Sequence, residues 1–364
     1  MEACCGFMTD IYSSHIVHPD QLSASDRGRW DDFCLEDHDL SKAFLSLSYV
    51  LAASRIFRDV RVCVIKRSGQ VVAFFPFQFR SLGHRLLGYG ERIGGELSDY
   101  FGLVAAVDVV LSPLQLVRLA GLNALLFTHL DESQSRYGLT GSNPQTGLLI
   151  NLDKGGDAYW SEIKQADKRF FNDTERRVRK LVETHGPLHL VYHHENPVVE
   201  LDRLIDLKRQ QYARTGADDV LKDGRIRQFL GLLAQSEDPL CRGVVSTLYA
   251  GDTWVASHFG LQHRSVLHFW FPVYNLELQN YSPGRVLITE IIKQADALGI
   301  TRIDRGVGDS QAKRDFANGE HTFLRGLWQQ PNASALVIRV GLFLQWRMET
   351  IPRRLVGSIK KLVK

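Results

Sequence analysis

The chain has 364 residues, a length typical of about two domains. Hydrophobic residues make up 44% and charged residues 23% of the chain, a globular composition that excludes the disordered, collagen-like and coiled-coil classes. The net charge of +3 gives no overall indication of a nucleic-acid-binding protein. Five cysteines without a C-x-x-C pair or zinc-finger histidine spacing favour a reduced, cytosolic compartment.

Residues 1–155 predict an N-terminal lobe of mixed α and β structure. Apolar residues recur at helical spacing over residues 19–39 and 41–57, and two β-branched and aromatic runs around residues 67–70 predict a hairpin. Further elements are expected as strands at residues 100–107, 124–129 and 147–152 and as a helix over residues 113–120.

Residues 156–333 predict a second lobe. Residues 160–184 predict one long, strongly charged helix that ends before Gly186 and Pro187. The following elements are a strand at 188–193, helices at 197–213 and 226–234, and antiparallel strands at 243–250, 254–263 and 265–273. A helix over 284–298 and a strand over 301–305 then form a β-α-β crossover. This order favours an acyl-CoA transferase architecture over a doubly wound dinucleotide-binding sheet.

The segment Ser282-Pro283-Gly284-Arg285 opens the crossover helix. A first helical turn offers free backbone N–H groups and the positive end of the helix dipole, and Arg285 adds a charge with forked donors. The segment therefore predicts a diphosphate site, although an ordinary cap with Ser282 explains it equally well. Upstream, Pro272 cannot donate to a ladder, so its strand must bulge or lie at an edge, where an extended arm such as pantetheine is able to pair with the backbone.

Three segments of the second lobe resemble a known family. They are the basic run over residues 164–180, the strand and loop from Phe271-x-x-Tyr274 to Tyr281-Ser282-Pro283-Gly284, and the motif Asp304-x-Gly306-x-Gly308-Asp309-x-x-x-Lys313. Together with Leu97-Ser98-Asp99-Tyr100 in the first lobe, they resemble the CelD-type acetyltransferases of bacterial cellulose and exopolysaccharide gene clusters. That family belongs to the GNAT superfamily and carries the BioF2-like acetyltransferase domain.

The resemblance is strongest over residues 155–330 and implies an α/β (α+β) fold. It implies tandem GNAT-like lobes, each a mixed, mostly antiparallel sheet flanked by helices, with the donor site in the second lobe. The implied donor is acetyl-CoA or another acyl-CoA. The residues expected to bind it are Phe271, Ser282, Gly284, Arg285 and Val286. No metal is expected, because no set of histidines, cysteines or carboxylates has the spacing of a metal site.

Acyl transfer needs a base for the acceptor, stabilisation of the oxyanion and a proton for the leaving thiolate. The candidate bases are Asp304 and Asp309. Lys313 is the candidate for stabilising negative charge, Tyr274 for protonating the thiolate, and His258 for a further side chain facing the cleft. Structural roles explain several of them equally well, namely a helix cap for Asp309, a solvated surface for Lys313 and the core for His258.

We expect an acyl-CoA-dependent N- or O-acyltransferase that acts on a sugar or other small envelope or exopolysaccharide precursor, bound between the lobes. Alternatives remain open. The basic run at 164–180 supports one, and two departures from the family pattern support the other: Ala312 stands where relatives often have Tyr, and the loop 282–285 lacks repeated glycines. One alternative is a Fem-like aminoacyl transferase that uses aminoacyl-tRNA, the one nucleic acid for which the basic run at 164–180 is suited. The other is a non-catalytic scaffold or binding subunit of a polysaccharide synthase complex.

Residues 334–364 predict a basic amphipathic helix, broken near Pro352. Residues 335–364 hold seven basic residues and one acidic residue, a net charge of +6 that leaves −3 on the rest of the chain. Such a segment suits an anionic inner leaflet, so we expect a cytoplasmic protein with peripheral contact at the inner face of the cell membrane. A terminal helix packed on the second lobe is the alternative. No secretory signal and no membrane-spanning run is expected.

Overall fold

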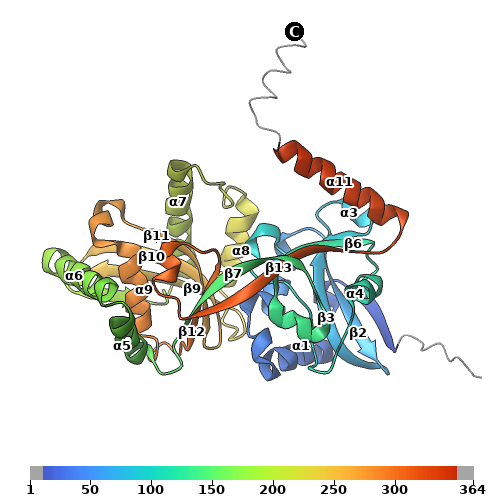
Figure 1. Ribbon diagram of the computed structural model, residues 1–364, viewed down its shortest axis with the longest axis horizontal. Helices are drawn as coiled ribbons and strands as arrows, with labels where there is room; N and C mark the ends of the chain where they lie inside the picture. The colour runs from blue at the N-terminus through green and yellow to red at the C-terminus, as the bar shows by residue number, and fades with distance from the viewer. Residues whose placement is uncertain (1–10, 351–364) are drawn as a thin grey trace, which may run out of the picture.

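The computed structural model describes residues 11–350, which form one long mixed sheet flanked by helices (Figure 1). In sheet order the strands are β1 (Tyr12–Val17), β2 (Val60–Arg67), β3 (Gln70–Gln78), β4 (Tyr89–Glu91), β6 (Ala124–Asp131), β13 (Gly319–Gln329), β7 (Ser142–Asn151), β12 (Arg302–Val307), β11 (Val266–Tyr274), β10 (Thr253–His263), β9 (Arg242–Ala250) and β8 (Leu188–Val191); β5 (Val104–Ala105) pairs with β3 off this path. Among these described strands, the β4–β6 and β11–β12 pairs are parallel and the other pairs are antiparallel.

The helices flank the sheet along its length. They are α1 (Ala24–Glu36), α2 (Leu47–Ile56), α3 (Leu82–Leu86), α4 (Pro113–Leu119), α5 (Gly156–Ala166), α6 (Lys168–His185), α7 (Pro197–Thr215), α8 (Gly224–Ala234), α9 (Pro283–Lys293), α10 (Gln311–Arg314) and α11 (Ala333–Thr350). Helices α5, α6 and α9 lie together at one end, α1 and α4 lie near β2 and β3 at the other, and α11 projects from the body (Figure 1). The arrangement confirms the predicted α/β (α+β) fold class.

Strands β13 and β7 join the two halves of the sheet. β13 pairs with β6 on one side and with β7 on the other, and β7 pairs in turn with β12. Both strands cross the middle of the molecule (Figure 1). β13 is a strand that the sequence pattern did not predict. It returns from the second half and brings residues such as His321 and Phe323 against the first.

The hydrophobic cores also connect the halves. Phe229 of α8 is fully buried and lies 5.3 Å from Tyr49 and 5.0 Å from Phe57, measured between ring centroids. Both partners belong to the first 155 residues, whereas α8 belongs to the second half. A separate cluster beneath α5 and α9 includes Trp160 and Phe316. Because edge and stacked aromatic pairs add to simple burial, the contact between α2 and α8 helps to fix the two halves together.

The structure corrects two of the predicted elements. The expected single helix at 160–184 is two helices, because Asp167 ends α5 and caps α6 by accepting a hydrogen bond from the Phe170 amide at 2.8 Å. The expected strand at 100–107 is reduced to β5 and an isolated bridge between Phe101 and Leu130. The predicted hairpin at 60–79 is confirmed as β2 and β3, with Gly69 in a left-handed turn at φ +83°.

The helix predicted at the C-terminus is present as α11 up to Thr350, and residues 351–364, including Pro352, lie outside the described residues. Within residues 11–350, no helix combines the length and apolar character that crossing a membrane requires. Three of the five cysteines fall in this range, Cys34, Cys63 and Cys241, and all three are buried free thiols.

Candidate functional site

The parallel strands β11 and β12 pair over only three residues before they separate. The pairs are Val266 with Arg302, Leu267 with Ile303 and His268 with Asp304. Beyond His268, β11 continues to Tyr274 and keeps its pairing with β10 alone. Of the two predicted possibilities for the strand bearing Pro272, a bulge or an edge, the structure shows an edge along this stretch, where the free side of β11 faces an opening between two strands.

A local distortion of β12 produces the separation. The register of β12 against β7 shifts between Asp304 and Val307, and Gly306 has φ of +63°. The carboxylate of Asp304 accepts a hydrogen bond from the Gly306 amide at 2.7 Å, which holds the bulge. Bulges of this kind redirect a strand and frequently border functional sites.

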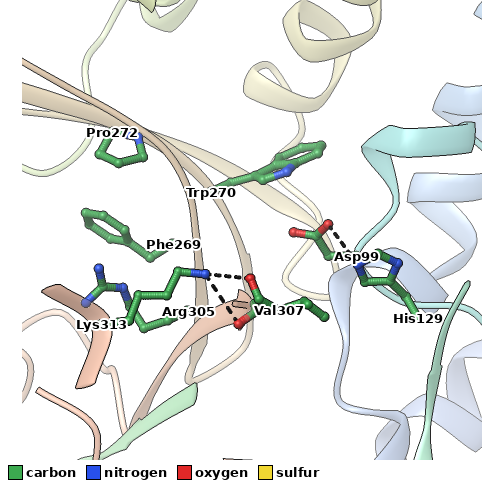
Figure 2. Close-up of a pocket in the computed structure, with 9 residues that line it drawn as sticks. Asp99, His129, Phe269, Trp270, Pro272, Arg305, Val307 and Lys313 are labelled. Atoms are coloured by element: carbon green, nitrogen blue, oxygen red, sulfur yellow. Dashed lines mark hydrogen bonds and ion pairs between the residues drawn. The ribbon is translucent and has the colours of Figure 1, made fainter. Parts of the chain in front are cut away.

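A cavity of about 170 Å³ lies in the opening (Figure 2). Its lining residues are Phe269, Trp270 and Pro272 of β11, Arg305, Gly306 and Val307 of β12, Lys313 of α10, and Asp99 and His129 from the first half of the chain. Among these described lining residues, Asp99 supplies the carboxylate and Arg305 and Lys313 supply fixed positive charges. Both halves of the chain thus contribute titratable side chains to one cavity.

Asp99, His268 and Asp304 form a chain of charged groups at the inner end of the cavity. His268 Nε2 lies 2.8 Å from Asp99 Oδ2, and its Nδ1 lies 3.4 Å from Asp304 Oδ2. Burial on its own would lower the pKa of His268, but the two carboxylates, Asp304 foremost, raise it to about 9. Burial would raise the pKa of Asp304, yet His268 holds it well below the usual range. The two groups therefore persist as an imidazolium and a carboxylate at neutral pH.

Tyr100 and His321 complete the surroundings of Asp304. Tyr100 donates its hydroxyl hydrogen to Asp304 Oδ2 at 2.5 Å, and burial together with the Asp304 charge raises its pKa well above the usual value. His321 of β13 lies between two carboxylates, with Nδ1 3.1 Å from Asp131 and Nε2 3.8 Å from Asp304. Asp304 is only 2% exposed, and its oxygens face these donors. It therefore holds the side chains of Tyr100, His268 and His321 around one buried carboxylate.

His129 of β6 lines the cavity from the side of the first half of the chain. Its φ of +59° is unusual for a residue other than glycine, and such strain is typical of functional positions. The Arg92 guanidinium lies 3.0 Å from His129 Nδ1, and a guanidinium only donates, so Nδ1 accepts and Nε2 carries the hydrogen. Burial and the Arg92 charge lower the pKa of His129 to about 4. The neutral ring therefore presents its Nε2–H toward Asp99, 3.9 Å away.

The sequence-predicted catalytic residues are only partly brought together. Asp304 belongs to the charged cluster, and Lys313 lines the same cavity while donating to the Val307 carbonyl at 2.7 Å (Figure 2). His258 lies in the adjoining core, where its ring stacks on Phe269 at 4.1 Å and its Nδ1 lies 2.9 Å from Ser246. Burial lowers the pKa of His258 to about 3, which keeps the ring neutral.

Two other candidates lie outside this cavity. Tyr274 is 36% exposed and lines a separate cavity together with Arg214 and Trp254. Asp309 is exposed and forms an ion pair with Arg314. Neither residue is among those that line the cavity beside Asp99.

Of the predicted donor-binding residues, Ser282, Gly284, Arg285 and Val286 lie at the start of α9, whereas Phe271 lies in β11. Ser282 precedes the helix with φ of +54°, and its carbonyl accepts hydrogen bonds from the amides of Arg285 and Val286. Gly284 faces open space, since a Cβ built there would meet no atom within 4 Å. Val286 and Phe271 are buried, as core packing requires.

Arg285 lies in a group of arginines around one carboxylate. Asp173 lies 2.7 Å from Arg177, 3.0 Å from Arg285 and 2.5 Å from Arg176. The hydrogen bonds from Arg177 and Arg176 lower the pKa of Asp173 to about 2. Three guanidinium groups share a single carboxylate, so the entrance to α9 carries an excess of positive charge.

Sequence reasoning missed most of the residues that face the cavity or support it. Asp99 and Tyr100 fall within the Leu97-Ser98-Asp99-Tyr100 segment of the family resemblance, which was the available signal. His268 and Arg305 interrupt otherwise apolar strands, and this pattern alone makes them candidates for functional residues. His129 and His321 depend on β6 and on the unpredicted β13, so no local pattern identified them.

Residues 168–314 match the family model described as the acetyltransferase (GNAT) domain. This part of the chain is similar to that domain. The match covers the strands from β8 to β12, including the separating pair β11 and β12, together with α9. Comparison of the sequence with curated proteins finds no match.

Solved structures share the fold over most of the chain. FemX matches with a TM-score of 0.54 at 11% identity, covering 85% of this chain and 96% of FemX. A conserved protein of unknown function from Bacteroides thetaiotaomicron VPI-5482 matches with a TM-score of 0.52 at 10% identity, covering 84% and 97%. The C-terminal domain named for a lysylphosphatidylglycerol synthetase of Agrobacterium fabrum matches with a TM-score of 0.50 at 12% identity, covering 88% and 97%. At these identities the likeness establishes the fold alone.

Proposed function

We propose that this GNAT-like domain transfers an acyl group from an acyl-CoA, with acetyl-CoA as the simplest donor, to an amine or hydroxyl acceptor bound between the two halves. The observation that carries the proposal is the separation of β11 from β12 after His268 and Asp304, with a cavity in the opening. An extended, amide-bearing arm fits a free strand edge, because β11 pairs with β10 alone beyond His268. At Pro272 itself the carbonyl already accepts a hydrogen bond from Lys208 at 2.9 Å.

The start of α9 supports a diphosphate-bearing donor. The positive end of the α9 dipole attracts anions, and the arginines around Asp173 add charge there. The amides of Arg285 and Val286 are already engaged by the Ser282 carbonyl. Gly284 leaves the space beside the first turn open. These features favour coenzyme A over a donor without a diphosphate.

Asp99 is the base in this proposal. It lines the cavity, and His268 and His129 each present a nitrogen to it, at 2.8 Å and 3.9 Å. His129 is excluded as the base because Arg92 occupies its Nδ1 and its Nε2 is already protonated. The acceptor nitrogen or oxygen attacks the thioester carbon, its proton passes to Asp99, and the carbon–sulfur bond breaks. The proton then returns through solvent to the coenzyme A thiolate.

The acceptor is proposed from the family resemblance to be a sugar or small envelope or exopolysaccharide precursor. A larger cavity between the halves adjoins this site through Arg92, which lines it together with Arg58 and Arg80 and also contacts His129. A polar acceptor entering there reaches Asp99 from the first-half side.

Titration calorimetry with acetyl-CoA tests the proposal. We expect saturable binding of one molecule per chain, weakened when the charge at α9 is removed in Arg285→Gln and unchanged in Arg302→Gln, which removes a charge at the far end of β12. Release of free thiol from acetyl-CoA, with water as the acceptor, gives the accompanying rate. Absence of binding to acetyl-CoA and succinyl-CoA would overturn the proposal.

The same titration addresses the two alternatives left by the sequence. An enzyme that uses aminoacyl-tRNA binds that donor and not acetyl-CoA, and the exposed basic residues of α6 are the surface on which such binding would depend. A scaffold binds neither donor. Either result contradicts acyl-CoA transfer.

A further inference from the structure

Two positive side chains in the acyl-transfer cavity lack a negative partner. Arg305 and Lys313 both line it, and neither forms an ion pair with a carboxylate among residues 11–350. The Nη1 atom of Arg305 is buried and has no hydrogen-bond partner among those residues. Its guanidinium instead lies 5.2 Å from the centroid of the Phe269 ring. A buried donor of this kind is costly to leave unpaired.

The negative groups nearby are already engaged. Asp99 is bound by His268, and Asp304 accepts from Tyr100 and Gly306. Lys313 donates to the carbonyls of Val307 and Gly306, at 2.7 Å and 3.5 Å, which satisfies two hydrogens but supplies no charge. Burial accordingly lowers the pKa of Arg305 to about 10 and lowers that of Lys313 as well. Among the described residues, no carboxylate therefore pairs with the positive charges of Arg305 and Lys313 in the cavity.

From this we infer that the cavity binds a carboxylate group carried by one of the two substrates, with Arg305 as its main partner and Lys313 as a second. The inference rests on the proposed acyl transfer and narrows its substrate class. A planar guanidinium suits a carboxylate because its parallel N–H groups donate to both oxygens. The carboxylate either ends the transferred acyl group, as in a succinyl donor, or belongs to the acceptor.

Two binding arms and one substitution test the inference. Calorimetry compares succinyl-CoA with acetyl-CoA, and thiol-release rates compare glycine with glycinamide as acceptors. We expect one of the two carboxylate-bearing probes to be favoured by about tenfold or more, the range for a charge-assisted hydrogen bond. The preference disappears in Arg305→Gln and is partly kept in Arg305→Lys. Arg302→Gln is the matched control, since Arg302 lies in the same strand and donates to Asn151 instead.

The outcomes separate this inference from the proposed function. Equal affinity for both coenzyme A thioesters and equal rates with both acceptors overturn the carboxylate site while leaving acyl transfer intact. A preference that survives in Arg305→Gln overturns it as well. Failure of both thioesters to bind contradicts the proposed function; succinate, compared with chloride at equal ionic strength, then still reports on the anion site through a rise in Tm that Arg305→Gln abolishes.

A different observation concerns the surface of α11. The helix packs on the body through Ala335 and Ile338, which are 1% and 5% exposed, against a small cluster with Tyr89 and Ala124. Its opposite side carries large apolar side chains that face solvent. They are Leu336 at 62%, Val337 at 58%, Val340 at 48%, Phe343 at 54% and Leu344 at 55% exposure.

These exposed positions recur at helical spacing and form one apolar stripe. Arg339 and Arg347 of the same helix are exposed as well, and residues 335–364 carry a net charge of +6. An apolar stripe accompanied by positive charge is the combination that binds an anionic lipid surface, where side chains enter the headgroup boundary and the charges face phosphates. The helix projects from the body, which leaves this side accessible (Figure 1).

The geometry points to α11 as a docking surface for an anionic membrane. Co-sedimentation uses vesicles of phosphatidylcholine with phosphatidylglycerol, and vesicles of phosphatidylcholine alone. We expect binding to the first that falls with added salt and is lost in Val337→Ser/Leu344→Ser. The control is Val107→Ser/Val110→Ser, because those valines are 61% and 60% exposed elsewhere on the surface. Equal sedimentation with and without vesicles, or a stripe that instead drives dimerisation in light scattering, overturns the assignment.

Discussion

Tyr100 donates a hydrogen bond to Asp304 over 2.5 Å, although 204 residues separate them in the chain. The bond joins the first half of the sheet to the strand that carries the glycine motif of the second. It therefore links the stability of the interface between the halves to the geometry of the cavity.

Replacing Tyr100 with Phe removes this donor and leaves a buried carboxylate with one hydrogen bond fewer. We expect the free energy of unfolding to fall by about 1–3 kcal/mol, the range for a buried charged group that loses its partner. Urea denaturation at pH 7 measures the change. Tyr249→Phe is the control, since the Tyr249 hydroxyl makes no hydrogen bond among the described residues. An equal effect of both substitutions would contradict the role of Tyr100.

His268 gives the protein a stability that depends on pH. Its pKa is about 9 in the folded state against 6.5 when unfolded, because Asp304 and Asp99 favour the charged form despite burial. The contribution is complete below pH 6.5 and is lost as the pH rises through 9, and it amounts to about 3 kcal/mol. His268→Gln keeps a hydrogen-bonding side chain but removes the titration. Unfolding free energies of the two proteins should converge between pH 6.5 and 9.5, and a constant difference would refute the pairing.

Many helices and strands could be predicted from the sequence because their periodicity and turn residues lie within the element itself. The hairpin of β2 and β3, the meander of β9 to β11 and the crossover helix α9 each carry their own periodicity and turn residues. The break between α5 and α6 was missed because Asp167 acts as a cap only in the folded geometry, and residues 160–184 read as one amphipathic run.

The cavity could be predicted only in part, for a physical reason. Asp304 and Lys313 belong to one recognisable motif, whereas Asp99, His129 and His321 arrive from segments far apart in the chain. These residues come together because β13 inserts between β6 and β7. Hydrophobic periodicity along the sequence does not predict such a nonlocal strand pairing. Arg305 and His268 looked like interruptions of apolar strands, and their chemistry became visible only once the separation of β11 and β12 was known.

Gly147 of β7 is predicted to be essential for the position of His321. A Cβ at this residue would lie 2.6 Å from Cε2 of Phe323 and against the His321 ring, so the ring must move. Gly147→Ala should destabilise the protein by about 1–3 kcal/mol, as overpacking does. Gly231→Ala, in α8 with open space around it, should instead stabilise by about 0.5–1 kcal/mol. Thermal unfolding of the pair distinguishes crowding at the site from a general intolerance of alanine.

Asp99→Asn tests the assignment of the base. Asparagine preserves the shape of the side chain and can still face His268 and His129, but it accepts no proton from the acceptor. We expect kcat for acyl transfer or thioester hydrolysis to fall by about 10²–10⁴-fold, with the affinity for acetyl-CoA measured by calorimetry unchanged. The residual rate should rise with pH, since hydroxide then replaces the missing base.

The comparison variant for this prediction is Asp309→Asn, because the sequence motif pointed to Asp309 as an equal candidate. Asp309 is exposed and paired with Arg314, outside the cavity that Asp99 lines. Its loss should leave kcat within about twofold, the small change expected of a surface ion pair. If Asp309→Asn abolishes turnover and Asp99→Asn retains it, Asp309 is the base. Asp99 then serves only to hold His268 between two carboxylates.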